Sequence, residues 1–291
     1  MNYRLHLDLV FFSFFFSVLF CGLCALVDSL LGFWVFLELC GMSLVPSFFY
    51  SSCTGLQGFY GSLLSYVVVS GLSSVLIVSG IIFFGLYYLV LLGFVLKFGL
   101  FPFSLWVYRV FSGSNWFFIF LLSVVSKFPI LFFCFLLQSG CDYIMYFDCF
   151  LTLLMCSLFF WFFSNSWEFV WCHVSLSSIS TLIIACFCSD FTLCFFIYFY
   201  YSIWSSFCVL YFYALGSMSG VKNNFWWYCF LLLITPLSFP LFYKLSVCLA
   251  IINSCLYVVL IWSVYSFSEQ IFLYKLGSDY FYSTVYNDWL C

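Results

Sequence analysis

Long uncharged apolar runs follow one another along most of this chain, with only short polar breaks between them. A helix needs about 20 apolar residues to cross a bilayer, and backbone groups within lipid must be satisfied inside helices or a closed barrel. The runs are continuous rather than alternating, which favours helices over a barrel. Since 67% of the residues are hydrophobic and 6% are charged, we predict an all-α, polytopic transmembrane helix bundle.

The apolar runs predict about ten helices, near residues 9–27, 31–50, 61–82, 84–107, 116–137, 144–163, 169–188, 191–214, 226–248 and 249–265. The turns between them are short, so we expect no soluble domain within the bundle. After residue 265 the chain carries Glu269, Lys275, Asp279 and Asp288 among aromatic residues. We therefore expect a transmembrane domain over 1–265 and a polar or interfacial C-terminal tail over 266–291.

Four isolated charged residues lie inside these apolar runs: Glu38, Lys97, Lys127 and Lys244. A charged side chain at the centre of a bilayer costs roughly 2.5 to 3.5 kcal/mol on insertion scales, so such residues usually face a bundle interior and have a function. The alternatives are a structural ion pair and a lysine that extends to the headgroups. We favour a role in moving protons or ions.

Prolines interrupt two of the runs that carry a lysine. Pro102 follows Lys97 by five residues, and Pro236 and Pro240 precede Lys244. Proline removes a backbone donor and breaks a helix, and broken helices within membranes are where transporters build ion sites. One such motif could equally be a kink at the membrane edge, anchored by Trp106. Its repetition predicts an antiporter-like bundle with two interrupted helices.

The cysteines do not predict a metal or redox centre. Cys21 and Cys24 have the spacing of a ligand pair, but they fall within a predicted span and no second pair has zinc-site or iron-sulfur spacing. A Gly-rich nucleotide-binding loop is also absent from the sequence. We expect structural cysteines, no metal site and no cofactor bound by this chain.

The choice of apolar residues suggests the origin of the gene. Phe, Tyr and Cys are abundant, at 46, 22 and 17 residues, and these amino acids share T- and G-rich codons with Leu, Val, Gly and Trp. Such a bias is typical of skewed organellar genomes, so we expect a mitochondrially encoded protein.

Two segments resemble motifs of a known family. The stretch from Trp34 to Pro46 reads W-V-F-L-E-L-C-G-M-S-L-V-P and is similar to the pattern W-x-G-L-E-x-N-x-x-x-x-x-P of subunit 2 of mitochondrial NADH:ubiquinone oxidoreductase (complex I). Residues 97–110 resemble the family's K-x-G-x-x-P-F-H-x-W-V-P-E-V, with matches at Lys97, Gly99, Pro102, Phe103, Trp106, Val107 and Val110. Weaker likenesses lie at Tyr66 with Ser74, at Leu121 to Pro129, at Ser177 to Ile179 and at Pro236 to Lys244.

The sequence departs from this family at several positions. Ser104 and Thr181 stand where the family has histidines, and Tyr108 and Arg109 replace its Pro-Glu. Any proton relay that needs those imidazoles is therefore in doubt. We also expect the family's last helix to be missing after Lys244.

The resemblance implies an energy-coupling subunit of the membrane arm, which moves protons while electrons pass from NADH to ubiquinone. It implies that Glu38 and Lys97 form a charge-coupled pair, that Lys127 and Lys244 continue the path, and that Tyr66, Ser177, Ser178 and Thr181 support it. Partner subunits would carry FMN and iron-sulfur clusters, with ubiquinone as substrate of the complex. The implied partners are other membrane-arm subunits and lipids of the mitochondrial inner membrane, without nucleic acid and without homo-oligomers.

A polar stripe at helical spacing, formed by His173, Ser177, Ser180 and Thr181, has two interpretations. It could wet a seam between helices, or its hydroxyls could bond backbone carbonyls and allow close helix packing. For the whole chain, the alternatives to a complex I subunit are a free-standing proton-coupled transporter and a purely structural membrane scaffold.

Overall fold

The computed structural model describes residues 3–50, 56–83, 86–136, 142–164, 166–217 and 225–281. Helices make up this part of the chain, and no strand occurs within it. The elements are α1 (Tyr3–Cys24), α2 (Leu30–Leu44), η1 (Val45–Tyr50), α3 (Leu56–Ile82), α4 (Tyr87–Phe98), α5 (Leu105–Ser112), α6 (Trp116–Ser123), η2 (Val125–Lys127), α7 (Phe128–Leu136), α8 (Asp142–Phe162), α9 (Trp167–Cys188), α10 (Phe191–Ser217), α11 (Phe225–Leu232), α12 (Phe239–Ile251) and α13 (Leu256–Phe281).

The predicted polytopic bundle is confirmed. Nine of the predicted spans each overlap one helix or one interrupted helix, whereas the last, 249–265, covers the end of α12 and only the first part of α13. Within the described residues, 7 helical stretches are long and apolar enough to cross a membrane, and shorter apolar helices lie at Asp8–Cys24, Tyr87–Phe98 and Phe239–Ile251. The chain is therefore a multi-pass membrane protein.

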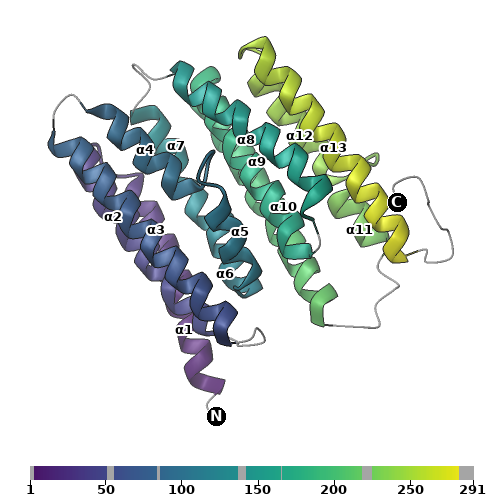
Figure 1. Cartoon of the computed structure of the whole chain (residues 1–291), viewed down its shortest axis with the longest axis horizontal. Coiled ribbons are helices and arrows are strands. Elements are labelled where there is room, and N and C mark those ends of the chain that lie inside the picture. Colours follow the sequence, from purple (N-terminus) through teal and green to yellow (C-terminus); the bar gives the residue numbers. More distant parts are fainter. Residues whose placement is uncertain are drawn as a thin grey trace.

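The helices form two groups of successive crossings, α1–α7 and α8–α13, which lie side by side (Figure 1). Each group begins with three helices, continues with an interrupted pair, α4–α5 or α11–α12, and ends with one further crossing. Corresponding elements run in opposite directions in the two groups (Figure 1). Inverted repeats of this kind are common in secondary transporters, whose sites lie at the interface between the repeats.

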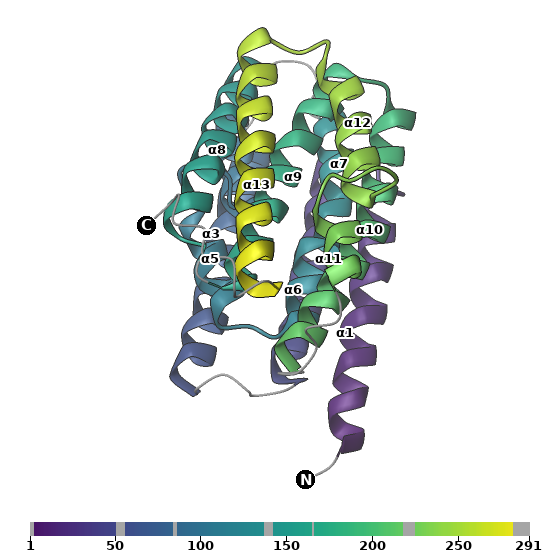
Figure 2. The same ribbon diagram turned by 90° about the vertical axis from the view of Figure 1, so that its right-hand side faces the viewer.

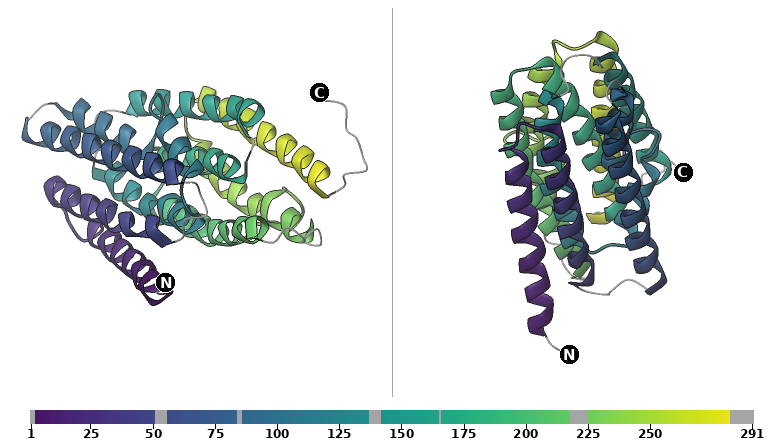
Figure 3. Two further views of the ribbon diagram at one scale, coloured as in Figure 1. Left: turned by 60° about the horizontal axis from the view of Figure 1, so that its bottom comes forward. Right: turned by 90° about the vertical axis from the view of Figure 1, so that its left-hand side faces the viewer.

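Helix α9 occupies the centre of the molecule, between α8 and α13 on one side and α10 and α12 on the other (Figure 2). Every residue from Val170 to Cys186 is buried. At the other extreme, α1 lies at the edge of the bundle (Figure 3) and exposes Phe11 and Phe15. Because α9 contacts α5 and α7 of the first group as well as α8, α10 and α12 of its own group, it joins the two groups.

The first interruption follows Lys97. Helix α4 ends at Phe98, and Gly99 takes a left-handed conformation with φ 70°. A Cβ on Gly99 would lie 2.2 Å from Val107 Cγ2, so both the backbone and the space require glycine. The Trp106 indole then donates to the carbonyl of Leu96 at 3.0 Å, which satisfies one of the acceptors left free at the end of α4.

The second interruption lies between α11 and α12, where Pro236 precedes Leu237 at φ 68°. The Gln270 side chain of α13 accepts from Ile234 N at 2.9 Å and donates to Leu232 O at 3.4 Å. The indole of Trp204 donates to Leu231 O at 2.8 Å. A tryptophan therefore covers the exposed carbonyls at both predicted breaks.

A third interruption, η2 between α6 and α7, was not predicted. Pro129 has no N–H to donate to Val125 O, so the helix cannot continue regularly through this turn. Tyr198 and Tyr201 of α10 donate to the carbonyls of Val124 and Ser123, at 3.2 and 3.3 Å. The sequence contains the cause, but the tyrosines that compensate for it lie about seventy residues away, at separations of 74 and 78.

The expected start of a polar tail at residue 266 does not coincide with an element boundary, because α13 continues to Phe281. Glu269 was expected at or outside the interface, but it is buried. The reason is its pairing with Lys244, which allows a carboxylate to lie inside an apolar helix. Residues 282–291 of that expected tail lie outside the described residues.

Close packing of α3 on α4 depends on Gly93. A Cβ there would lie 2.9 Å from Ser73 O and 2.7 Å from Ile77 Cγ1. By contrast, a Cβ on Gly71, also in α3, would meet nothing within 4 Å. Small residues let membrane helices approach closely.

We expect Gly93→Ala to lower the free energy of unfolding by about 1–3 kcal/mol, the usual cost of overpacking. Thermal unfolding of the purified protein in detergent micelles would measure it. Gly71→Ala is the matched control and should leave the transition unchanged. Equal transitions for the two variants would contradict the packing described.

Candidate functional site

The first lysine forms an ion pair between two helices. Lys97 lies in the last turn of α4, and its Nζ is 3.0 Å from Glu38 Oε2 of α2. The side chains are 12% and 20% exposed, so water screens this pair only in part. The two residues expected to form a charge-coupled pair are thus in direct contact, while their role in proton transfer stays a prediction.

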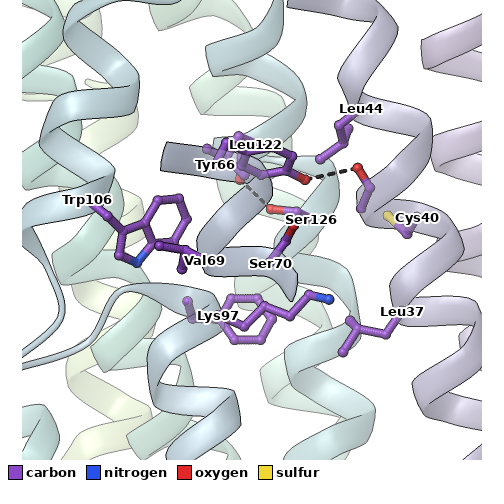
Figure 4. Close-up of a pocket in the computed structure, with 12 residues that line it drawn as sticks. Leu37, Cys40, Leu44, Tyr66, Val69, Ser70, Lys97, Trp106, Leu122 and Ser126 are labelled. Carbon is purple, nitrogen blue, oxygen red and sulfur yellow. Dashed lines mark hydrogen bonds between the residues drawn. The ribbon is translucent and has the colours of Figure 1, made fainter. Parts of the chain in front are cut away.

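A small cavity adjoins this ion pair (Figure 4). Its walls come from α2, α3, α4, α5 and the α6–η2 break, and the residues that line it are Leu37, Cys40, Gly41, Leu44, Tyr66, Val69, Ser70, Lys97, Phe98, Trp106, Leu122 and Ser126. About 40 Å³ of it is open to the centres of water-sized molecules, which is enough for about three waters at roughly 10–15 Å³ each. The cavity therefore extends from Lys97 to the residue before Lys127.

Tyr66 lines this cavity from α3, and its hydroxyl donates to Gly41 O at 3.0 Å. Ser126 lines it from η2, and its hydroxyl donates to Leu122 O (Figure 4). The hydroxyl oxygens of both residues keep lone pairs that can accept from water. Water in this space would have polar neighbours at both ends.

Lys127 is buried, and no carboxylate among the described residues forms an ion pair with it. Its Nζ donates to Ser175 O at 2.8 Å, to Ser178 Oγ at 2.6 Å and to Tyr201 OH at 2.7 Å. Ser178 in turn donates to Ser175 O, and Tyr201 donates to Ser123 O. Because both hydroxyls donate their hydrogens to carbonyls, they can only accept hydrogen bonds from Lys127. Three acceptors match the three N–H groups of an ammonium ion.

Lys244 forms the second ion pair. It lies in α12, after the second interruption, and its Nζ donates to Glu269 Oε2 of α13. A further hydrogen bond reaches Ser266 Oγ at 3.0 Å, one helical turn before Glu269. The side chains of the pair are 11% and 5% exposed. The interrupted pairs α4–α5 and α11–α12 thus each supply a lysine that pairs with an acid from another helix.

The polar stripe of α9 divides between the two interpretations. Ser177 is hydrogen-bonded to Tyr265 OH at 2.7 Å, and Ser178 accepts from Lys127. Ser180 and Thr181, however, donate to carbonyls of their own helix, at Leu176, Ser177 and Ser178. Three of the four expected supporting hydroxyls, Tyr66, Ser177 and Ser178, therefore link helices. The hydrogen bonds that Ser180 and Thr181 donate within α9 follow the packing interpretation.

Several residues of the site were missed by the sequence analysis. Tyr201, Tyr265 and Ser266 stand in helices rich in such residues, so no local signal marks them. Glu269 was assigned to the tail because Ser266, Ser268 and Gln270 surround it and Lys275 follows six residues later. Asp148 of α8 was also passed over, and its Oδ2 has no hydrogen-bond partner among the described residues.

The cysteines form one notable contact. The Cys21 sulfur lies 3.2 Å from the sulfur of Cys40 in α2. Among the described residues, no group of three or more His, Cys, Asp or Glu side chains could hold a metal ion. The expectation that this chain binds no cofactor stays a prediction.

Tyr201→Phe should lower the free energy of unfolding by about 1.5–3 kcal/mol, because Lys127 loses a hydrogen bond to a charged group. In a Lys127→Met background the same change should cost less, since no ammonium remains to be satisfied. Thermal unfolding in detergent micelles gives both differences. Tyr198→Phe is the matched control, because that hydroxyl bonds Val124 O instead. Additive effects of Tyr201→Phe and Lys127→Met would refute the assignment.

Comparison with known proteins rests on structure alone. No protein-family profile matches this sequence, and no curated protein matches it. The fold is similar to a chain in a structure of respiratory complex I from Thermus thermophilus with bound aureothin, with a TM-score of 0.72 and 15% sequence identity. The match covers 92% of this chain and 69% of that chain. The chain therefore has the fold of a membrane subunit found in that complex.

Proposed function

We propose that this chain is a membrane-arm subunit of NADH:ubiquinone oxidoreductase, of the antiporter-like subunit 2 type, in the mitochondrial inner membrane. The observation that carries the proposal is the series of three intramembrane lysines with their partners, held in a fold similar to a chain of bacterial complex I. The motif likeness around Glu38 and Lys97 supports the choice of subunit. Its partners would be other membrane-arm subunits and lipids.

The proposed contribution of this chain is proton translocation. Electron transfer would take place in partner subunits that carry FMN and iron-sulfur clusters, with ubiquinone as the acceptor. In this proposal the chain responds to that chemistry through its buried charges, because a carboxylate beside a buried lysine favours the charged lysine and burial alone disfavours it. Separating Glu38 from Lys97 would therefore leave two uncompensated charges inside the bundle.

The contacts suggest the order in which the side chains would carry a proton. The cavity between Lys97 and Ser126 has room for water, and Lys127 is the next residue after Ser126. From Lys127, the Tyr201 ring lies 5.8 Å from the Tyr243 ring, and Tyr243 precedes Lys244. We infer a path from the Glu38–Lys97 pair through Lys127 to the Lys244–Glu269 pair.

Replacing Lys97 by Met should lower the number of protons moved per NADH oxidised, while the enzyme still assembles. The measurement is the proton-to-electron ratio of the assembled enzyme in proteoliposomes. Lys275→Met is a matched control, because Lys275 lies near the end of α13, away from the three lysines of the path. An assembled Lys97→Met enzyme with an unchanged ratio would rule out the proposed role.

Membership of a large complex can be tested directly. Native gels of mitochondrial membranes, stained for NADH oxidation and analysed by mass spectrometry, should contain this chain in the large NADH-oxidising band. A chain found only in a small, inactive band would instead indicate a free-standing transporter. In that case, solute-driven proton flux in liposomes would be the expected activity of the chain alone.

A further inference from the structure

His173 is a buried histidine that the path through the three lysines does not use. Its side chain on α9 is fully buried, and Nδ1 lies 2.8 Å from the hydroxyl of Tyr108 on α5. The other ring nitrogen, Nε2, has no hydrogen-bond partner among the described residues. Buried polar atoms are nearly always hydrogen-bonded, so the unpaired Nε2 of His173 indicates a partner such as water or a functional role.

The side of α9 that carries His173 is not the side that binds Lys127. At about 100° per residue, Ser175 and Ser178 lie roughly 140–160° around the helix from His173. Ser177 lies only about 40° from His173 and one turn further along. The Ser177 hydroxyl is bonded to Tyr265 OH of α13 at 2.7 Å. This side of α9 therefore has polar contacts of its own, to α5 and to α13.

These contacts lead to the second ion pair. Tyr265 and Glu269 are four residues apart in α13, hence about 6 Å apart along the helix axis and on the same side. His173 and Ser177 have the same spacing on α9. Side chains four residues apart on one helix face are neighbours, so a water between them would have polar partners on both sides. Nε2 of His173, the Ser177–Tyr265 hydroxyls and Glu269 provide such partners.

The outer end of this series lies close to one surface of the bundle. Tyr108 is one turn from the end of α5 at Ser112, and His173 is six residues from the start of α9 at Trp167. These two helix ends lie at the same side of the molecule (Figure 1). A proton could therefore reach Tyr108 and His173 from that surface without passing Lys97 or Lys127.

We propose that Tyr108, His173, Ser177 and Tyr265 form a second proton-transfer branch, on the opposite side of α9 from Lys127, that ends at Glu269. In each transfer the imidazole accepts a proton at one ring nitrogen and releases the proton of the other nitrogen to water, so the ring returns to a neutral form. Tyr108 exchanges protons between the surface and His173, and water exchanges them between His173 and Ser177. The branch rests on the proposed function in proton translocation.

The experiment compares variants of the assembled enzyme in proteoliposomes, with the proton-to-electron ratio as readout and native gels as a check of assembly. Tyr108→Phe and Tyr265→Phe each remove one oxygen and keep the ring, and both should give a partial loss of the ratio. Combining Tyr108→Phe with Lys127→Met should lose more than either single variant, because the two branches run in parallel. Ser180→Ala is the matched control, since that hydroxyl bonds carbonyls of its own helix.

Wild-type ratios in both assembled tyrosine variants would overturn the branch, as would a double variant no worse than Lys127→Met alone. The Lys97→Met enzyme distinguishes failure of the branch from failure of the proposed function. If it loses pumping while Tyr108→Phe and Tyr265→Phe do not, the branch fails and the proposed function stands. If Lys97→Met also pumps normally, the proposed function itself fails and the branch fails with it.

Discussion

Backbone groups inside a membrane must find partners within the protein, and this constraint governs every irregular feature of the bundle. Three crossings are interrupted, and at each one side chains from other helices or from beyond the break cover the freed carbonyls: Trp106 at α4, Trp204 and Gln270 at α11, and Tyr198 and Tyr201 at the α6–η2 break. Abundant aromatic residues with a polar atom serve this purpose well, because their rings stay in apolar surroundings. The breaks can therefore lie deep in the bundle, beside the lysines.

The three lysines are stabilised in two different ways. Lys97 and Lys244 each pair with a carboxylate, so their charge is balanced locally, and removing one partner of such a pair leaves the other uncompensated. Lys127 is surrounded by neutral oxygens, which satisfy its hydrogen bonds but not its charge. A proton on Lys127 is thus balanced only at longer range, whereas a proton on either end lysine is balanced by its neighbour.

The sequence was sufficient for the helical class, the positions of all spans but the last and the two proline breaks, because each depends on local composition or on one residue type. It also identified all three lysines and Glu38, since an isolated charge in an apolar run is visible without a structure. It could not identify Tyr201, Tyr265 or Tyr108, because one tyrosine among 22 becomes special only through a contact made far along the chain. Glu269 was misplaced for a different reason: the hydrophobic run was ended too early, at residue 265.

Helix α9 touches Lys127 through Ser178 and Tyr265 through the adjacent Ser177. Adjacent residues of a helix point about 100° apart and are rigidly linked, so turning α9 about its axis moves both hydroxyls together. A rotation of α9 that breaks the Ser178–Lys127 contact therefore also displaces the Ser177–Tyr265 contact. A movement of α9 that starts in either half of the molecule would therefore change the contacts on both sides of the helix together.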